Sequence, residues 1–217
     1  MRYNVLLWDL DGTLTDSKEG ITRSVQCALE HLDYPLREAD DLDWIIGPPL
    51  RESFKTLLQT TDEVLLDQAI MFYRERYRET GLYENIVYPG IPELLRQLKE
   101  KGCRHLLATA KPRVFAEKIL RHFLLDAYFS VIMGSELNGQ FAEKDCLIAE
   151  VLKTVPAGSR SKSVMIGDRN YDVRGARANH IDVISVGYGY GTDEELREAA
   201  PDFIVQSVAD LGELLSS

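Results

Sequence analysis

The chain has 217 residues, of which 45% are hydrophobic and 28% charged, proportions that are ordinary for a globular protein. Its formal net charge of −10 argues against a nucleic-acid polymer as the main partner. No apolar run approaches the roughly 18 residues of a membrane span, so no membrane partner is expected. The three cysteines, Cys27, Cys103 and Cys146, are odd in number and far apart, which argues against a disulfide framework. We expect reduced, mostly buried thiols in a cytoplasmic protein without a signal peptide.

Short apolar runs and helical patterns follow one another along the chain. The first run, at residues 5–8, precedes a long segment, 15–85, that holds no convincing strand but three amphipathic helical patterns, at 21–32, 50–58 and 64–73. Further apolar runs occupy 106–108, 131–133, 164–166, 183–186 and 203–205. Helical patterns at 91–101, 115–123, 148–152 and 211–215 lie between most of them or follow the last.

This alternation predicts an α/β fold, a Rossmann-like doubly wound parallel sheet with a small all-helical domain inserted after the first strand. The predicted core domain consists of residues 1–14 and 86–217, and the predicted helical cap domain of residues 15–85. A monomer and a small homo-oligomer are both compatible with the sequence.

An acid pair directly follows the first predicted strand, in Asp9-Leu10-Asp11-Gly12-Thr13. In an extended segment Asp9 and Asp11 point to the same side, at the carboxyl edge where α/β sheets bind ligands. Two close carboxylates repel each other, and a divalent cation or a shared proton relieves that repulsion. Gly12 permits the sharp turn that follows. A strand-end turn with solvated acids is the structural alternative.

A second acidic cluster, Gly167-Asp168-Arg169-Asn170-Tyr171-Asp172, follows the strand predicted at 164–166. Asp168 is predicted to complete an oxygen-rich Mg²⁺ site with Asp9, because Mg²⁺ favours a few carboxylates plus waters and phosphate oxygens. Asp172 would either bind the cation or orient its waters. Capping of a helix by an acid is the alternative.

A hydroxyl and an amine complete the set. Thr109 follows the predicted strand at 106–108, where a hydroxyl ahead of a helix suits a phosphate oxygen, and Lys144 lies near the start of a later helix. Each is weak evidence alone, since capping threonines and solvated lysines are common. The order in which the four features occur, each at a strand end or a helix start, favours a phosphate site.

Together these segments resemble the four motifs of the haloacid dehalogenase superfamily, and the insert resembles the C1 cap of that family. The resemblance covers essentially the whole chain. Two further stretches look like the phosphoglycolate phosphatase and 5′-nucleotidase-like branch, namely Gly47-Pro48-Pro49-Leu50 and Tyr88-Pro89-Gly90. The resemblance implies a Mg²⁺-dependent phosphomonoester hydrolase that acts on a small phosphorylated metabolite through an aspartyl-phosphate intermediate.

The resemblance also implies a role for each matching residue. Asp9 would be the nucleophile and Asp11 the general acid and base. The transferred phosphate would contact Gly12, Thr109, Ala110 and Lys144. The cation would be held by Asp9, the backbone carbonyl of Asp11 and Asp168, with Asp172 beside it. Two departures are Trp8, where phenylalanine is usual, and Asp145, where proline often follows the lysine; Lys111 is the alternative to Lys144.

The loop Gly47-Pro48-Pro49-Leu50-Arg51 is the candidate for substrate contact from the insert. Arg51 or Lys18 would meet an anionic leaving group, although a helix-connecting turn with a solvated Arg51 fits equally well. The acidic run Asp40, Asp41 and Asp43 is expected to be solvated surface.

Several alternatives stay open or are weakened by single residues. Asp11 argues against dehalogenases and phosphonatases, which lack the second acid, and the lack of histidine in 16–22 argues against phosphomutases. Phosphoglycolate, nucleoside monophosphates, pyrophosphate and other small phosphates are not separated. A non-catalytic phospho-ligand sensor is the alternative from another class; it has no need of Asp11, and metal-dependent phosphate release from an aryl phosphate would exclude it.

Overall fold

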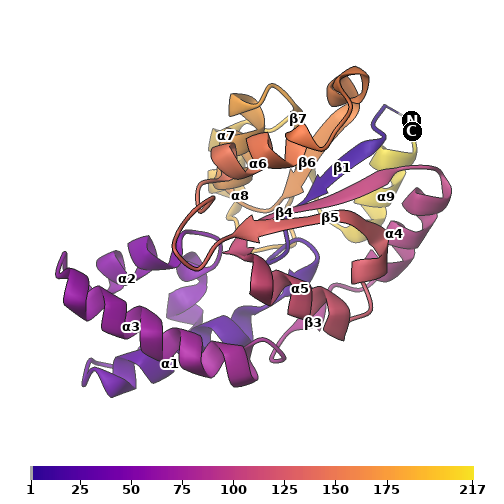
Figure 1. The fold of residues 1–217 in the computed structure, drawn as a ribbon. Helices are drawn as coiled ribbons and strands as arrows, with labels where there is room; N and C mark the ends of the chain where they lie inside the picture. The colour runs from indigo at the N-terminus through magenta and orange to yellow at the C-terminus, as the bar shows by residue number, and fades with distance from the viewer. Residues whose placement is uncertain (1) are drawn as a thin grey trace. The chain divides into compact units, whose positions relative to one another are not determined.

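The structure is a computed structural model that describes residues 2–217. Its main sheet has six parallel strands in the order β5-β4-β1-β6-β7-β8 (Figure 1). The strands are β1 (Val5–Trp8), β4 (Arg104–Pro112), β5 (Phe129–Ser135), β6 (Ser163–Gly167), β7 (Asp182–Val186) and β8 (Phe203–Val205). Each contains or coincides with one of the predicted strands, so the predicted doubly wound parallel sheet is confirmed.

Helices cover both faces of this sheet, which explains why its central strand reads as an unbroken apolar run. All four residues of β1 are buried, as a strand covered on both faces requires. On one side Val5 and Leu7 belong to a core cluster with apolar residues of α6 (Lys144–Lys153) and α7 (Asn170–Ala178). Figure 1 shows α4 (Ile91–Glu100) and α5 (Arg113–His122) on the other side.

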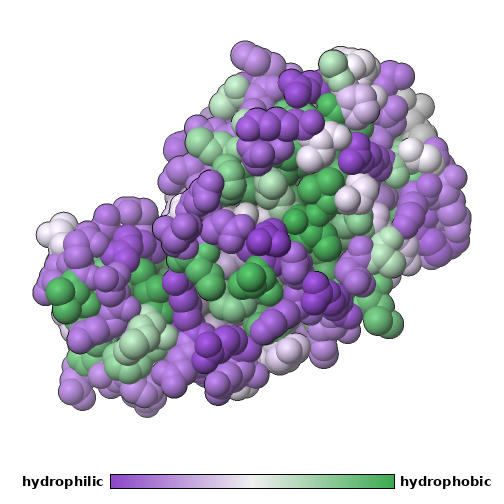
Figure 2. All heavy atoms as spheres, in the orientation of Figure 1, coloured by the Kyte–Doolittle hydropathy of each residue, from purple (hydrophilic) through white to green (hydrophobic). Residues whose placement is uncertain are grey.

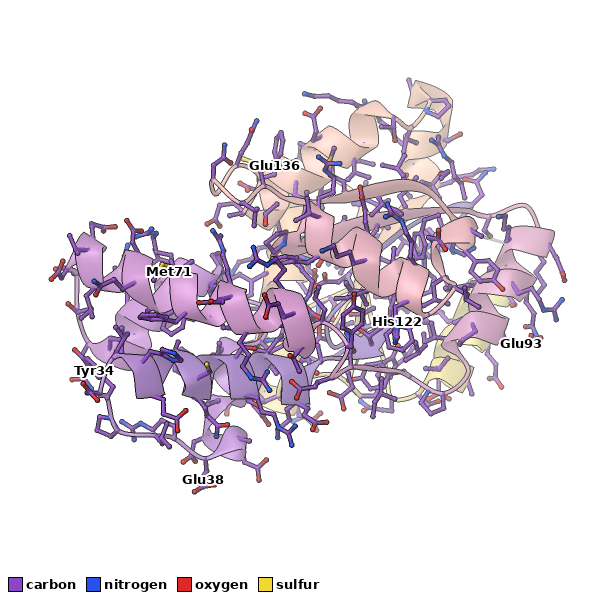
Figure 3. All side chains as sticks on the ribbon, turned by 60° about the horizontal axis from the view of Figure 1, so that its bottom comes forward. Tyr34, Glu38, Met71, Glu93, His122 and Glu136 are labelled. Atoms are coloured by element: carbon purple, nitrogen blue, oxygen red, sulfur yellow. The ribbon has the colours of Figure 1, made fainter. Side chains whose placement is uncertain are left out.

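The remaining elements of this unit lie toward its edges and loops. Helix α9 (Val208–Ser216) packs beside α4, and α8 (Asp193–Ala199), which the sequence pattern did not predict, packs beside α7. Two short 3₁₀ helices, η3 (Asp126–Tyr128) and η4 (Ala157–Lys162), precede β5 and β6. Glu136, which directly follows β5 and is labelled in Figure 3, accepts a hydrogen bond from Arg113 Nε at 3.2 Å.

The chain divides into two compact units, Met1–Asp16 with Val87–Ser217, and Ser17–Ile86. The predicted boundaries at 14/15 and 85/86 lie within two residues of these divisions. Short strands β2 (Thr15–Asp16) and β3 (Ile86–Val87) pair with each other where the chain passes from one unit to the other. That the second unit acts as a cap stays a prediction.

The second unit is helical throughout its regular part. It consists of α1 (Lys18–His31), the 3₁₀ helix η1 (Ala39–Ile45), α2 (Leu50–Leu58), α3 (Glu63–Arg76) and the π-helical turn η2 (Tyr77–Gly81). Asp62 caps α3 by accepting hydrogen bonds from the backbone N–H groups of Val64 and Leu65. Met71, labelled on α3 in Figure 3, is exposed, and Figure 2 shows such green hydrophobic residues scattered among purple hydrophilic ones over these helices.

The fold tests the expectation that the thiols are mostly buried. Only Cys103 of the three cysteines is buried, whereas Cys27 is half-buried and Cys146 is exposed, so the prediction of mostly buried thiols was wrong. Cys146 lies in the first turn of α6, where its side chain points away from the core. Across residues 2–217 no helix has both the length and the apolar character needed to cross a bilayer.

One buried polar pair makes the core sensitive to acid. Trp8 Nε1 donates a hydrogen bond to His105 Nδ1 at 3.0 Å, and His105 is 1% exposed. Burial lowers the pKa of this imidazole to about 4, against an ordinary value of 6.5. The imidazole of His105 binds a proton more readily in the unfolded chain than in the folded core. The stability that is present above pH 6.5 is therefore lost as the pH falls toward 4.

Replacing His105 with glutamine, whose amide oxygen can accept from Trp8, is expected to flatten this part of the stability profile. The free energy of unfolding of the wild type should fall by roughly 3 kcal/mol more than that of His105→Gln between pH 6.5 and 4. Urea denaturation at a series of pH values measures both curves. Parallel curves for the two proteins would contradict the assignment.

Candidate active site

Acidic side chains converge where the central strands of the sheet end. Asp9 follows β1, and Asp168 follows the neighbouring β6, so both stand at the carboxyl edge. One carboxylate oxygen from each of Asp9, Asp168 and Asp172 lies within 4.8 Å of the others. Asp168 and Asp172 are fully buried and Asp9 is 5% exposed. The three acids therefore form one buried cluster, drawn from two distant parts of the chain.

Lys144 is the cation that holds this cluster together. Its Nζ lies 2.7 Å from Asp9 Oδ2, 2.7 Å from Asp172 Oδ1 and 2.9 Å from the carbonyl oxygen of Ala108. These acceptors match the three donors of an ammonium group. Burial disfavours the charged form, but Asp172 and Asp9 outweigh it and raise the pKa of Lys144 above its ordinary value. Lys144 thus stays positively charged. It offsets the negative charge of Asp9, which a phosphoryl group would have to approach.

The donor set fits a divalent cation. Burial, and then the negative charges of Asp172 and Asp9, raise the pKa of Asp168 well above its usual range. Asp168 therefore carries an uncompensated electrostatic cost that a bound cation would remove. With all four carboxylates ionised, the site counted together with Asp11 and Lys111 has two more negative than positive charges, which one Mg²⁺ would balance. Oxygen-only ligands of this kind suit Mg²⁺.

Asp11 is paired with a second buried lysine. Lys111 Nζ lies 2.8 Å from Asp11 Oδ2, and the lysine side chain is 5% exposed. The other carboxylate oxygen, Asp11 Oδ1, is buried and has no hydrogen-bond partner among the described residues. Lys111 was the alternative to Lys144 as the phosphate lysine; the structure pairs Lys144 with Asp9 and Lys111 with Asp11. The free acceptor on Asp11 is available to a hydroxyl group of a substrate or a water.

Thr109 is buried, but the predicted strand end and helix start around it were wrong. Strand β4 continues to Pro112, with a register shift between Thr109 and Pro112, and α5 begins only at Arg113. The backbone N–H of Lys111 donates to Thr109 Oγ1 at 3.3 Å, which leaves the hydroxyl proton for another acceptor. Ala110 presents its carbonyl oxygen to Ser135 Oγ at 2.7 Å. Contacts of Thr109 and Ala110 with phosphate remain predictions.

Gly12 is required at its position for two reasons. Its φ of +75° lies in the left-handed region, and a Cβ there would come within 2.1 Å of Asp168 Oδ2. Thr13 Oγ1 donates to Asp168 Oδ1 at 3.4 Å. The turn after β1 therefore packs directly on Asp168, and the two motifs that are far apart in sequence form one structure.

The cations predicted to reach the substrate from the insert are already paired inside the second unit. Arg51 forms ion pairs with Glu63, at 2.5 Å, and with Asp67. Lys18 Nζ lies 2.7 Å from Asp40 and 2.8 Å from Asp43. These ion pairs link η1 to the start of α1; Asp40 and Asp41 are exposed and Asp43 is half-buried, so the prediction of solvated surface is confirmed for Asp40 and Asp41. Substrate contact by Arg51 or Lys18 stays a prediction.

The sequence reasoning missed one segment of this site, the loop Gly187-Tyr188-Gly189-Tyr190-Gly191. It follows β7 and so lies at the same carboxyl edge. The backbone N–H of Tyr190 donates to Asp168 Oδ2 at 2.8 Å, and Tyr188 donates its hydroxyl proton to the carbonyl oxygen of Thr13 at 3.0 Å. The alternation of glycine and tyrosine directly after an apolar strand was the available signal.

With this geometry established, comparison with known proteins decides the family. The model of the haloacid dehalogenase-like hydrolases matches residues 6–186. The chain belongs to this family. A 5′-nucleotidase of Pseudomonas aeruginosa is 46% identical to this hydrolase over 219 residues, which cover 100% of this chain and 97% of the relative. The crystal structure of a predicted phosphatase from Clostridium acetobutylicum superposes with a TM-score of 0.93 at 42% identity, covering 99% of this chain and 98% of the other.

Other relatives of this hydrolase carry different names. The tyrosine-protein kinase PtkA of Mycobacterium tuberculosis is 37% identical over 97% of this chain and 70% of its own length. A phosphoglycolate phosphatase of Colwellia psychrerythraea is 26% identical over 95% of this chain and 94% of its own. Similarity extends over almost the whole hydrolase in each case, so both units are shared with these proteins.

Proposed function

We propose that this hydrolase cleaves small phosphomonoesters in a Mg²⁺-dependent reaction that passes the phosphoryl group through Asp9. The protein is a phosphatase-type hydrolase of the haloacid dehalogenase-like family. The observation that carries the finer proposal is the buried cluster of Asp9, Asp168 and Asp172 around Lys144. Such a cluster of buried like charges is costly without a bound cation.

Asp9 is placed to act as the nucleophile. Its Oδ1 accepts a hydrogen bond from the backbone N–H of Leu10 at 2.7 Å and its Oδ2 binds Lys144, so the carboxylate is held in one orientation. An oxygen of Asp9 would attack phosphorus as the bond to the leaving oxygen breaks, which gives an aspartyl-phosphate. Mg²⁺, when bound by Asp9 and Asp168, supplies positive charge beside the phosphoryl oxygens. Lys144 adds a second positive charge, and Thr109 donates its hydroxyl proton to a phosphoryl oxygen.

Asp11 is placed to move the protons. In its protonated form it would give its proton to the leaving oxygen. The resulting carboxylate would take a proton from water as that water attacks the phosphorus, breaking the bond to Asp9 and releasing phosphate. The unpartnered, buried Oδ1 supports this assignment because it is a free acceptor beside the cluster.

Replacing Asp11 with asparagine is expected to reduce turnover by about 10² to 10⁴ while leaving Mg²⁺ binding largely intact. The reason is that the cation would contact the backbone carbonyl of this residue rather than its side chain. Steady-state phosphate release and calorimetric titration with Mg²⁺ measure the two effects separately. A variant that lost Mg²⁺ binding together with activity would contradict the assigned role.

The substrate is best sought among nucleoside 5′-monophosphates. The relative named 5′-nucleotidase is 46% identical over the full chain, whereas the relative named phosphoglycolate phosphatase is 26% identical. Phosphoglycolate and pyrophosphate are the alternatives, because relatives with those activities in their names also match nearly the whole chain.

A phosphate-release screen with nucleoside monophosphates, phosphoglycolate, pyrophosphate and an aryl phosphate tests both levels of the proposal. Release should require Mg²⁺, stop with EDTA, and have its highest kcat/KM with a nucleoside monophosphate. Metal-independent release would contradict the mechanism. Preference for phosphoglycolate or pyrophosphate would contradict only the choice of substrate.

A further inference from the structure

The loop after β7 links the acidic cluster to the place where the chain leaves the first unit. The backbone N–H of Tyr190 donates to Asp168 Oδ2 at 2.8 Å. The phenol of the same residue donates to Asp16 Oδ1 at 2.6 Å. Asp16 is the last residue of β2 and the last residue of the first unit before the chain enters the helical unit. One tyrosine therefore touches a candidate metal ligand and a connecting strand at once.

The loop has little freedom to approach Asp168 in any other way. A Cβ at Gly189 would come within 2.4 Å of Asp168 Cβ, and one at Gly191 within 2.0 Å of the Asp168 carbonyl oxygen. Glycine at both positions lets the backbone lie directly on Asp168. The hydrogen bond that Thr13 Oγ1 donates to this carboxylate, at 3.4 Å, is longer than the one donated by the Tyr190 N–H. The position of the Tyr190 backbone thus sets the orientation of the Asp168 carboxylate.

The phenol end of Tyr190 is equally well defined. Burial, and then the hydrogen bond to Asp16, raise the pKa of this phenol above its ordinary value, so the hydroxyl remains a donor. Tyr88 follows β3, where the chain returns from the helical unit. Tyr88 in turn packs edge-to-face against Tyr188, with ring centroids 4.9 Å apart. The side chain of Tyr190 is therefore anchored to β2, and the Tyr88 ring packs against the same loop.

We propose that Tyr190 is a positioning residue that couples the Asp168 carboxylate to strand β2, so that divalent-cation affinity depends on the Tyr190–Asp16 hydrogen bond. The proposal rests on the proposed function, because it takes Asp168 to be a ligand of the cation. Outer-sphere groups that orient metal ligands change metal affinity by about 10- to 100-fold when removed. Since the backbone N–H survives in Tyr190→Phe, we expect a loss near the lower end of this range.

Calorimetric titration of the purified protein with MgCl₂ in the absence of substrate is the primary measurement. Tyr190→Phe and Asp16→Ala should each weaken Mg²⁺ binding by roughly 10-fold, and the double variant should lose no more than either alone. Asp16→Asn, whose side-chain oxygen can still accept from the phenol, should retain most of the affinity. In steady-state assays kcat at saturating Mg²⁺ should change less than the Mg²⁺ concentration needed for half-maximal rate.

Tyr3→Phe is the matched control. Tyr3 also donates its hydroxyl proton to an aspartate, Asp182 Oδ2, at 2.5 Å, but Asp182 begins β7 and lies at the opposite edge of the sheet from the site. This variant should bind Mg²⁺ as the wild type does. Thermal denaturation of each variant shows that it is folded, and the two Asp16 variants test the coupling should Tyr190→Phe fail to fold.

The possible results separate this proposal from the function on which it rests. Wild-type protein that binds Mg²⁺ and releases phosphate, with unchanged affinity in Tyr190→Phe or Asp16→Ala, would overturn the coupling and leave the phosphatase function standing. Additive losses in the double variant would also overturn it. Wild-type protein that binds no Mg²⁺ would overturn both the coupling and the metal dependence. Non-additive losses with retention in Asp16→Asn would support the coupling.

Discussion

Asp9→Asn is expected to abolish phosphate release, with a loss on the order of 10⁴-fold or more in kcat, because an amide cannot form the acyl phosphate. The change preserves the shape of a side chain that is 5% exposed and removes one of three clustered negative charges, so the protein should remain folded. Phosphate release under saturating substrate and Mg²⁺ measures the loss. Rapid acid quenching with ³²P-labelled substrate should trap label on the wild-type protein and none on the variant.

Asp145→Asn is the matched control for this experiment. Asp145 is exposed and follows Lys144 directly in the sequence, and its carboxylate accepts a hydrogen bond from the adjacent Cys146 N–H at 2.7 Å. The same chemical change at this position should leave turnover within a few-fold of the wild type. Near-normal activity of Asp9→Asn would show that the phosphoryl group is not transferred to this residue.

Asp168→Asn is expected to raise the stability of the metal-free protein while it lowers the activity. The pKa of Asp168 is raised above the ordinary 3.8, so the metal-free wild type loses stability as the pH rises from 3.8 toward that raised value. Asparagine cannot ionise and escapes this loss. The variant should therefore be more stable than the metal-free wild type at neutral pH; replacing buried ion pairs by hydrophobic residues of similar volume has stabilised other proteins by about 1–4 kcal/mol.

The same variant should lose the response to metal. Mg²⁺ should raise the melting temperature of the wild type and leave that of Asp168→Asn unchanged, and activity should fall by more than the roughly 100-fold attributed to outer-sphere groups. Differential scanning fluorimetry from pH 5 to 8, with Mg²⁺ and with EDTA, records both effects. Asp182→Asn, at the far edge of the sheet, serves as the control. A Mg²⁺-induced stabilisation that persisted in Asp168→Asn would remove this residue from the metal site.

Much of the core fold was predictable because parallel strands covered on both faces are continuous apolar runs. The run at 5–8 coincides with β1, and the absence of a convincing strand pattern in the segment after it indicated the helical insert. The placement of Asp9 and Asp168 in one volume followed from a single rule, that the carboxyl ends of neighbouring parallel strands meet at one edge. Strand order was not needed for that inference, although it makes β1 and β6 neighbours.

What the sequence did not predict depends on contacts between distant side chains. The sequence favoured Lys144 over Lys111 as the phosphate lysine but did not predict their partners, and the structure shows that Lys111 pairs with Asp11 and Lys144 with Asp9. The register shift that extends β4 past Thr109 does not alter the hydrophobicity pattern of the sequence, so the sequence did not predict it. The glycines at 189 and 191 are explained by Asp168, which lies against them with its side chain and its backbone carbonyl and is about twenty residues earlier in the chain.

The strand order also constrains how the protein can be made. Strand β1 is synthesised before the other strands of the sheet. Its two neighbours, β4 and β6, begin only at Arg104 and Ser163. Strand β1 therefore has no partner until β4 has been translated, and only one partner until β6 follows. Closing such long loops is entropically costly and makes folding slow compared with proteins dominated by local contacts. The nascent chain therefore exposes an unpaired apolar strand until β4 has been translated, and the acidic cluster at the carboxyl end of that strand cannot form before Asp168 and Asp172 have been added.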